Sequence, residues 1–327
     1  MTTPIVNITV PVFNRPELTR QTLQAVRKHT RIPHCLTVVD NGSDAETRDL
    51  LIGMKERGDI DHLFRLAKNF GVAVAANVGW RLVDAPLYMK LDNDVVMHSA
   101  RWFEIVLGKM QAHPGPSVWG ADLNFQLDNV NYVKEREGFQ GKTHAHISGG
   151  AILIPRNVSD VLGYWCEDYG LYGCEDGDYG ERLRTLSVDQ FYFDHQPFMT
   201  HLGDDAGIMK DDHSLDKQKA KKAHLALWQT SKYLIDREHR SPNIPAQFVP
   251  AAFDGYALTI ERNTSYLEIF KAFVEFHKTR LEHDEYSQPF LSALNNLITI
   301  QNATWDQALQ SADKQYSVIR KQVENGS

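Results

Sequence analysis

The chain has 327 residues, of which 42% are hydrophobic and 24% charged, and its formal net charge at pH 7 is -7. This length accommodates a large α/β domain with a smaller appendage, and the negative charge provides no general attraction for nucleic acid. No apolar run approaches the ~20 residues that span a bilayer, so no membrane-spanning helix is predicted.

The N-terminal residues and the cysteines bear on the cellular compartment. The first residues lack a basic segment and enter a strand almost at once, which argues against a secretory signal. Cys35, Cys166 and Cys174 are an odd set without zinc-binding spacing, which suits a reducing compartment better than a disulfide framework. We therefore expect a cytoplasmic protein.

Strands and helices alternate from the N-terminus onward. An apolar, β-branched strand over residues 5–10 precedes a predicted loop over 11–16 and a helix over 17–29. The next strand, residues 35–39, ends on Asp40. Because a β-α-β crossover makes neighbouring strands parallel, the loop and Asp40 are expected at the same edge of a sheet.

One short apolar strand ends in two acids. It covers residues 87–91, follows a helix predicted over 72–82, and leads into Asp92-Asn93-Asp94. Aspartate is a poor strand former, so both carboxylates are expected at the edge of the sheet rather than in its core. A divalent cation such as Mg²⁺ or Mn²⁺ prefers oxygen ligands and often bridges carboxylates to phosphates, which fits this position. The alternative is a turn with two solvated acids.

Other polar residues near strand ends have two interpretations each. Asp40 can accept the ring N–H of uracil or guanine, or it can belong to the cap of a helix predicted over residues 44–57. Asn69, which follows a strand over residues 63–66, and Asn77 can bond phosphate, ribose or their own backbone.

Four motifs, in this order, resemble the family 2 glycosyltransferases of GT-A fold. They are Pro11-Val12-Phe13-Asn14-Arg15, Val38-Val39-Asp40-Asn41-Gly42-Ser43-Asp44, Asn69-x-Gly71-x5-Asn77 and Leu91-Asp92-Asn93-Asp94. Downstream, Ser148 to Ile154 resembles a strand of the family's second half, and Tyr172 to Asp178 resembles its acidic element. The resemblance covers residues 5 to about 203 and implies an α/β domain with a Rossmann-like, mostly parallel sheet flanked by helices.

The resemblance also implies roles for particular residues. Asp92, Asp94 and His201 are expected to bind Mn²⁺ or Mg²⁺, although a lone histidine at a strand end is more often structural. Asp176 is expected to be the general base, and Glu175 to bond an acceptor hydroxyl. The residues expected to bind the nucleotide sugar are Pro11, Val12, Phe13, Asn14, Arg15, Asp40, Asn69, Asn77, Asp92, Asn93, Gly149 and Gly150.

The acidic element and the glycine pair have plainer interpretations as well. Glu175, Asp176 and Asp178 lie where acids complement the positive end of a helix. Gly149 and Gly150 allow the backbone to approach a sugar closely, or they form a bulge or turn before the next strand.

The pattern changes after residue 204. A polar break is followed by helical patterns over residues 216–238, 265–282, 290–300 and 304–323. We predict a catalytic domain over residues 1–204 and a helical C-terminal extension over residues 205–327. The Gln-x-x-Arg-Trp element of the processive, membrane-embedded relatives does not occur, so transfer of one sugar or a few is expected.

These features predict an inverting, metal-dependent, non-processive glycosyltransferase with a UDP- or GDP-sugar as donor and an open choice of acceptor; inversion is implied by the family alone. One alternative is a sugar-1-phosphate nucleotidyltransferase, whose expected glycine-rich, arginine-bearing N-terminal loop does not occur. A second is a noncatalytic sugar- or nucleotide-binding module. A third is a transferase acting on nucleic acid through the basic residues 217–222, which are more simply a solvated helix face, so nucleic acid is not an expected partner.

Overall fold

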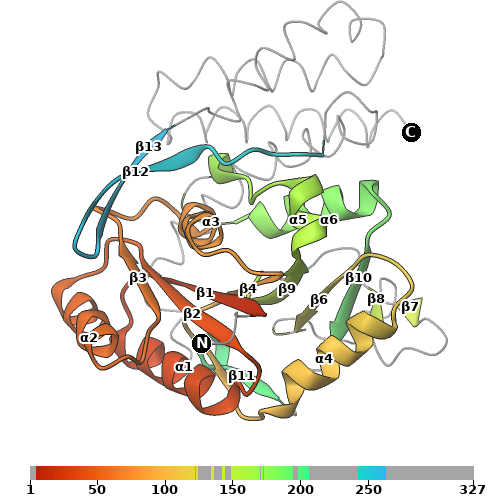
Figure 1. Cartoon of the computed structure of the whole chain (residues 1–327), viewed down its shortest axis with the longest axis horizontal. Coiled ribbons are helices and arrows are strands. Elements are labelled where there is room, and N and C mark those ends of the chain that lie inside the picture. The colour runs from red at the N-terminus through yellow and green to blue at the C-terminus, as the bar shows by residue number, and fades with distance from the viewer. Residues whose placement is uncertain are drawn as a thin grey trace, which may run out of the picture.

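The computed structural model describes residues 5–121, 123, 134–135, 142–143, 149–169, 171, 173–193, 198–205 and 242–262. Its centre is an 11-stranded mixed sheet in the order β12-β13-β3-β2-β1-β4-β9-β6-β10-β8-β7, and β11 pairs with β5 in a second, two-stranded sheet. Helices cover both faces of the large sheet, with α1, α2 and α4 on one side and α3, α5 and α6 on the other (Figure 1). The predicted α/β sheet flanked by helices is confirmed.

The strands are β1 (Val6–Val12), β2 (His34–Asp40), β3 (His62–Arg65), β4 (Leu87–Leu91), β5 (Val95–Met97), β6 (Ser117–Ala121), β7 (Lys134–Glu135), β8 (Lys142–Thr143), β9 (Ala151–Pro155), β10 (Asp189–Phe193), β11 (Met199–His201), β12 (Phe248–Asp254) and β13 (Ala257–Arg262). The helices are α1 (Pro16–His29), α2 (Ala45–Glu56), α3 (Val72–Leu82), α4 (Arg101–Ala112), α5 (Arg156–Leu162), α6 (Glu175–Thr185) and α7 (Leu202–Asp205), with a 3-10 turn at Glu167–Tyr169.

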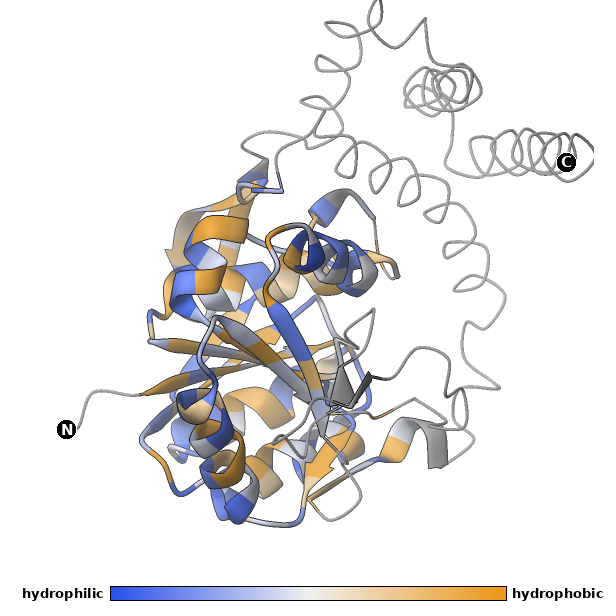
Figure 2. Cartoon of the chain, turned by 90° about the vertical axis from the view of Figure 1, so that its right-hand side faces the viewer, coloured by the Kyte–Doolittle hydropathy of each residue, from blue (hydrophilic) through white to orange (hydrophobic). Residues whose placement is uncertain are grey.

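The four strands β3, β2, β1 and β4 are parallel to one another, and β9 is antiparallel to β4 and β6. Loops at the carboxyl ends of the parallel strands therefore meet at one edge, as the β-α-β pattern predicted. Hydrophobic and hydrophilic residues alternate along the helices in Figure 2, as expected of helices that pack one side on a sheet. Within the described ranges, no helix has the length and apolar content needed to cross a membrane.

Strand β1 is buried along its whole length and has a polar face. Val6, Ile8 and Val10 pack in the core shared with α1, α2 and α4. Asn7, on the opposite face, donates its side-chain amide to the carbonyls of Gly79 (3.1 Å) and Val83 (2.8 Å) at the end of α3. Satisfying these carbonyls fixes the end of α3 against the sheet.

Strand β1 extends further than the sequence predicted. Pro11 and Val12 were expected in a loop, but they continue the strand and pair with Val39 and Asp40 of β2. A proline is tolerated there because the pairing of β1 with β4 ends at Thr9, so the missing N–H removes no ladder bond on that side. The loop at the sheet edge is therefore residues 13–15.

The part of the chain predicted to be a helical extension contributes two strands. Strands β12 and β13 form an antiparallel hairpin, and β13 pairs with β3, so residues 248–262 extend the large sheet (Figure 1). Gly255, with φ of 57°, takes the first position of the two-residue turn, where glycine costs least. The four helices predicted between residues 216 and 323 lie outside the described residues, and the division at residue 204 stays a prediction.

Candidate active site

The loop after β1 is bonded to the loops after β2 and β4. The Asn14 amide donates to Ser43 Oγ (3.0 Å), and Asn14 Oδ1 accepts from the Asp44 amide (2.9 Å). Asn93 donates its side-chain amide to the Asn14 carbonyl (3.4 Å). Asn14 and Arg15 both have left-handed backbones, with φ of 57° and 61°. Such non-glycine residues persist only where their surroundings hold them, and these contacts between loops do so.

Asp94 lies between two cationic side chains. Arg15 Nη1 is 3.1 Å from its Oδ2, and His201 Nε2 is 3.2 Å from its Oδ1. His201 reaches this position because β11 pairs antiparallel with β5, which places it opposite Val95. Burial raises the pKa of Asp94, but the hydrogen bond from His201 and the charges of His201 and Arg15 outweigh burial, so the pKa lies below its usual value.

Backbone packs directly against Asp94. A Cβ built on Gly203 would lie 2.4 Å from Asp94 Oδ2 and 3.6 Å from His201 Nε2, so only glycine leaves room beside these two side chains. A carboxylate and an imidazole are donors that Mn²⁺ accepts. The two side chains, with the space that Gly203 leaves, therefore fit part of a site for a divalent cation.

The structure does not bring the three predicted metal ligands together. Asp94 and His201 are paired, whereas Asp92 Oδ1 accepts a hydrogen bond from Lys90 Nζ at 2.5 Å. In the regions that the structure describes, no three His, Cys, Asp or Glu side chains are grouped as a metal site would require. The reason is a turn between the two acids, in which the Val95 amide donates to the Asp92 carbonyl (3.2 Å).

Lys90 is a site residue that the sequence analysis did not identify. Its ammonium group is buried and donates to Asp92 Oδ1 (2.5 Å) and to the Gly149 carbonyl (2.6 Å). Burial lowers the pKa of Lys90, but the negative charges of Asp92, Glu175 and Asp176 raise it above the usual value, so the group stays cationic. A lysine inside the apolar stretch 87–91 was the available signal, since lysine is almost never fully buried unless paired.

The two acids expected to face the acceptor begin α6. The amide of Gly177 donates to Asp176 Oδ1 (2.7 Å), and the Gly149 amide donates to Asp176 Oδ2 (3.4 Å). A Cβ on Gly149 would lie 3.4 Å from both Asp176 Cβ and Lys90 Nζ. Gly149, Lys90 and Asp176 are therefore packed together, and Asp176 itself is only half-buried.

Glu175 is buried and lacks a partner for one oxygen. Its Oε2 accepts no hydrogen bond from any residue that the structure describes. Burial, together with the charge of Asp176, raises the pKa of Glu175 to about 7. The carboxyl group can therefore bind or release a proton near neutral pH, a property typical of acid–base groups in active sites.

Asp40 lies at the carboxyl end of β2, beside Arg65. Its Oδ1 accepts from the Ser43 amide (2.8 Å), and its Oδ2 pairs with Arg65 Nε (3.3 Å). The capping residue of α2 is Asp44, which accepts from the Thr47 amide, so Asp40 does not cap that helix. Asp40 is therefore a buried, paired carboxylate at the sheet edge.

The two predicted asparagines have different positions. Asn69 Oδ1 accepts from the Gly71 amide and from the Asn41 side chain, both at 2.9 Å, which shapes the loop after β3. Asn77 is fully buried: its side chain donates to the Trp165 carbonyl and to Glu167, and accepts from the Trp165 amide. Asn77 therefore joins α3 to residues 165–167 and is not brought to the sheet edge.

Residues 7–161 match the model of glycosyl transferase family 2. A curated relative, validoxylamine A glucosyltransferase of Streptomyces hygroscopicus subsp. limoneus, is 33% identical over 116 residues, which are 35% of this chain and 25% of the relative. The relative of the same name from Streptomyces hygroscopicus subsp. jinggangensis is 32% identical over 116 residues. The match thus spans about a quarter of the length of these relatives.

Solved structures share the fold at low sequence identity. The mannosyltransferase PcManGT from Pyrobaculum calidifontis, in complex with GDP-Man and Mn²⁺, superposes with a TM-score of 0.54 at 15% identity over 92% of this chain and 76% of that one. GalNAc-T7 with UDP, GalNAc and Mn²⁺ gives 0.50 at 13% identity over 58% of this chain and 42% of that one. With residues 7–161 matching the family and the sheet matching these structures, the chain carries a family 2 glycosyltransferase domain of GT-A fold.

Proposed function

We propose that this protein is an inverting, metal-dependent, non-processive glycosyltransferase that moves one sugar from a UDP- or GDP-sugar to an acceptor nucleophile. The observation that supports it best is the position of Lys90, whose ammonium bonds Asp92 and the Gly149 carbonyl beside Asp176. Donor-binding acids and acceptor-facing acids thereby share one buried cation. Both halves of a transfer site are present at a single edge of the sheet.

The donor side is formed by residues 13–15, Asp40 and Asp94 in this proposal. Arg15 is partly exposed and lies at the edge where a diphosphate would bind, so it attracts the negative charge. Asp40 accepts the ring N–H of uracil or guanine, and Arg65 beside it orients the carboxylate. The GDP-Man and UDP of the similar structures are donors of these two classes.

Asp94 and His201 would hold the divalent cation, with further ligands from the diphosphate and from Asp92. A cation bound there supplies electrostatic stabilisation of the diphosphate as it leaves. Both similar structures contain Mn²⁺, which agrees with this choice of metal. Arg15 then no longer needs to neutralise Asp94 and is free to bind a phosphate oxygen.

On the acceptor side, Asp176 takes the proton of the acceptor as its nucleophile attacks the anomeric carbon. A one-step inverting displacement needs a base on the side opposite the leaving group. Glu175 binds an acceptor hydroxyl through its unpartnered Oε2. Lys90 keeps the negative charges of Asp92 and Asp176 apart, because it lies between the loop of Gly149 and the end of β4.

Thermal-shift measurements with UDP, GDP and their sugars, each with and without Mn²⁺, test the proposal. A ligand that binds the folded state raises the unfolding temperature by mass action. A nucleotide sugar that stabilises the protein only with Mn²⁺ supports the proposal. Formation of pyrophosphate from a nucleoside triphosphate and a sugar-1-phosphate would instead identify a nucleotidyltransferase, and binding without transfer to any acceptor or to water would identify a binding module.

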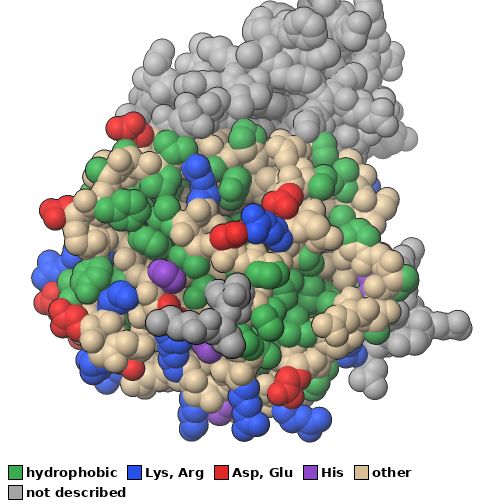
Figure 3. All heavy atoms as spheres, viewed as in Figure 1, with side chains coloured by type: hydrophobic (Ala, Val, Ile, Leu, Met, Phe, Trp, Pro, Cys, Tyr) green, Lys and Arg blue, Asp and Glu red, His purple; other side chains and the backbone are tan. Residues whose placement is uncertain are grey.

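Nucleic acid remains outside the proposal. On the face shown in Figure 3, basic side chains along the lower edge are interspersed with acidic ones, and no continuous basic surface is seen there. The basic cluster at residues 217–222 lies outside the described residues. Cytoplasmic location likewise stays a prediction from the cysteines.

A further inference from the structure

The first turn of α6 carries the two acceptor-facing acids, yet no described side chain caps it. Cys174, directly before Glu175, has a left-handed backbone with φ of 68° and gives no side-chain hydrogen bond to the helix. Gly173 before it also has a positive φ, of 100°. Contacts elsewhere on the helix must therefore set the orientation of Glu175 and Asp176.

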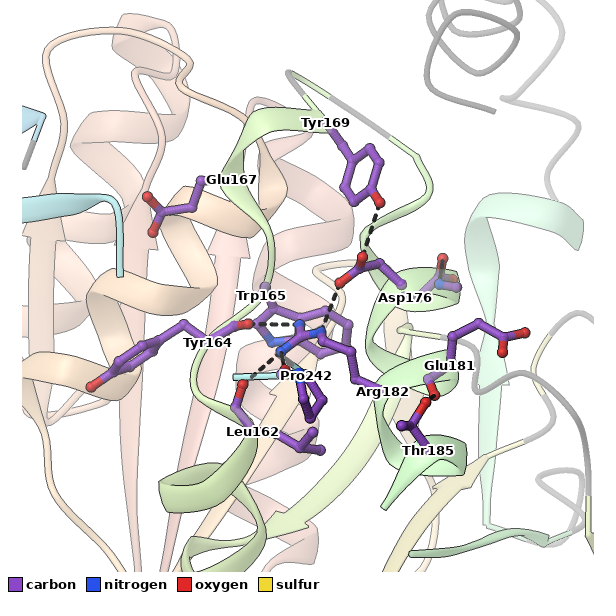
Figure 4. A network of polar contacts seen from close by, with 12 residues as sticks. Leu162, Tyr164, Trp165, Glu167, Tyr169, Asp176, Glu181, Arg182, Thr185 and Pro242 are labelled. Atoms are coloured by element: carbon purple, nitrogen blue, oxygen red, sulfur yellow. Dashed lines mark hydrogen bonds and ion pairs between the residues drawn. The ribbon is translucent and has the colours of Figure 1, made fainter. Parts of the chain in front are cut away.

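These contacts come from a buried ion pair one turn further along. Arg182 Nε donates to Asp178 Oδ2 at 2.8 Å, and the two side chains are 0% and 1% exposed. Tyr169 Oη donates to Asp178 Oδ1 at 3.0 Å. Asp178 is thus held from two sides, and it is two residues from Asp176 (Figure 4).

The guanidinium group of Arg182 also binds backbone carbonyls from two other segments. Nη1 donates to Leu162 (2.7 Å) at the end of α5 and to Pro242 (3.4 Å), and Nη2 donates to Tyr164 (2.8 Å) (Figure 4). A planar guanidinium is suited to such a fork of acceptors, and a cation also complements the carbonyl end of α5. One side chain therefore joins α6, α5 and the segment that begins at residue 242.

That segment is itself closely fitted to the end of α5. Ile244 donates its amide to the Leu162 carbonyl (3.0 Å) and accepts from the Tyr164 amide (2.9 Å). Gly163, with φ of 74°, lies so close that an added Cβ would be 2.0 Å from the Ile244 carbonyl oxygen. The acceptors of Arg182 are consequently fixed in place by residues that follow the predicted domain boundary at 204.

We infer that Arg182 is a positioning residue, which orients Glu175 and Asp176 by anchoring α6 to the end of α5 and to residues 242–244. The inference rests on the proposed function for its consequence in catalysis. Its structural part, the fixed first turn of α6, is independent of any substrate. It also assigns residues 242–244 to the catalytic unit.

The test compares Arg182→Lys with Arg184→Met. Lysine keeps the charge but cannot supply the planar fork, whereas Arg184 lies on the same helix with its side chain 48% exposed and pairs with Glu181. Hydrogen exchange of the amides at residues 175–178 should accelerate about tenfold in Arg182→Lys and stay unchanged in Arg184→Met, because exchange reports local opening. Unchanged exchange in a folded Arg182→Lys protein would overturn the inference.

A second measurement separates positioning from general loss of structure. In Arg182→Lys, kcat should fall by roughly 10-fold or more while the Kd for the nucleotide sugar changes less than threefold, the pattern expected when transition-state contacts alone are lost. Tyr169→Phe, which removes one hydrogen bond to Asp178 without changing volume, should show the same split more weakly and serves if Arg182→Lys does not fold. Equal losses in kcat and donor affinity would contradict positioning. If the wild-type protein transfers no sugar, the proposed function fails, and the exchange measurement still decides the structural inference.

Discussion

Lys90 Nζ lies 2.5 Å from Asp92 Oδ1 in the buried middle of the site, and the same ammonium is 2.6 Å from the Gly149 carbonyl. The two residues are on one strand and its following turn, two positions apart. Gly149 comes from the segment before β9, which pairs antiparallel with β4. The ion pair therefore links the end of β4 to the neighbouring strand next to Asp176.

Replacing Lys90 with methionine tests this link. Methionine has a similar length but leaves the Gly149 carbonyl and Asp92 without their donor, so the free energy of unfolding should fall by about 1–3 kcal/mol. Urea denaturation of both proteins measures the change. Lys28→Met, at an exposed position in the last turn of α1, is the matched control and should stay within ~0.5 kcal/mol. An unchanged stability of Lys90→Met would mean that the buried ammonium is not a structural link.

The raised pKa of Glu175 predicts a dependence of stability on pH. Its pKa is about 7 in the folded protein, against 4.5 for an exposed glutamate, so between these values the folded state binds the proton more tightly than the unfolded chain. The contribution of this group to stability is therefore complete below pH 4.5 and declines as the pH rises to 7, by roughly 3 kcal/mol in all.

Glu175→Gln should remove that decline, because glutamine does not ionise. Urea denaturation at pH 5 and pH 7.5 measures it: the variant should gain stability relative to the wild-type protein at the higher pH. Parallel pH profiles for the two proteins would show that Glu175 does not titrate in this range.

Asp94→Ala tests the cation site. Asp94 is the carboxylate that Arg15 and His201 both contact, so its loss should abolish the Mn²⁺-dependent part of nucleotide-sugar binding and nearly all transfer. Isothermal titration of the nucleotide sugar with Mn²⁺ and with EDTA measures the first effect. Asp49→Ala, whose side chain is 66% exposed, is the control and should behave as wild type. Full activity of Asp94→Ala in EDTA would eliminate the metal from the proposed mechanism.

Asp176→Asn tests the assignment of the base. Asparagine keeps the shape and removes the basicity, so kcat should fall by roughly 10² to 10⁴, the usual cost of losing a positioned base. Nucleotide-sugar affinity should change less than threefold, under ~1 kcal/mol. Steady-state kinetics and calorimetry separate the two quantities. Activity that survives in Asp176→Asn and disappears in Glu175→Gln would exchange the roles of the two acids.

Local patterns were enough to predict the strands and helices around the site. The alternation of apolar stretches predicted a β-α-β order, and that order places the ends of parallel strands at one edge whatever the remaining packing. Asp40, Asp92 and Asp94 follow directly from this rule, since each ends or follows a strand of the parallel group. Their position at the edge is confirmed by the strand order β2-β1-β4.

Contacts between distant segments could not be derived in this way. Asn77 was expected near the nucleotide because it lies in a motif, but the packing of α3 against residues 165–167 buries it. The hairpin after residue 247 was missed because helical patterns dominate the sequence around it, although Asp254-Gly255 is a turn signal.

What the sequence by itself determined is the order of elements, the sheet edge that carries the acids, and the family that these motifs resemble. These depend on residue type and spacing along short stretches, where a few neighbours decide the conformation. Tertiary structure alone decided which acids are partners: Asp94 pairs with His201 through the β5–β11 register, and Asp92 pairs with Lys90. The physical reason is that burial and charge pairing depend on segments more than 50 residues apart, whose approach no local pattern encodes.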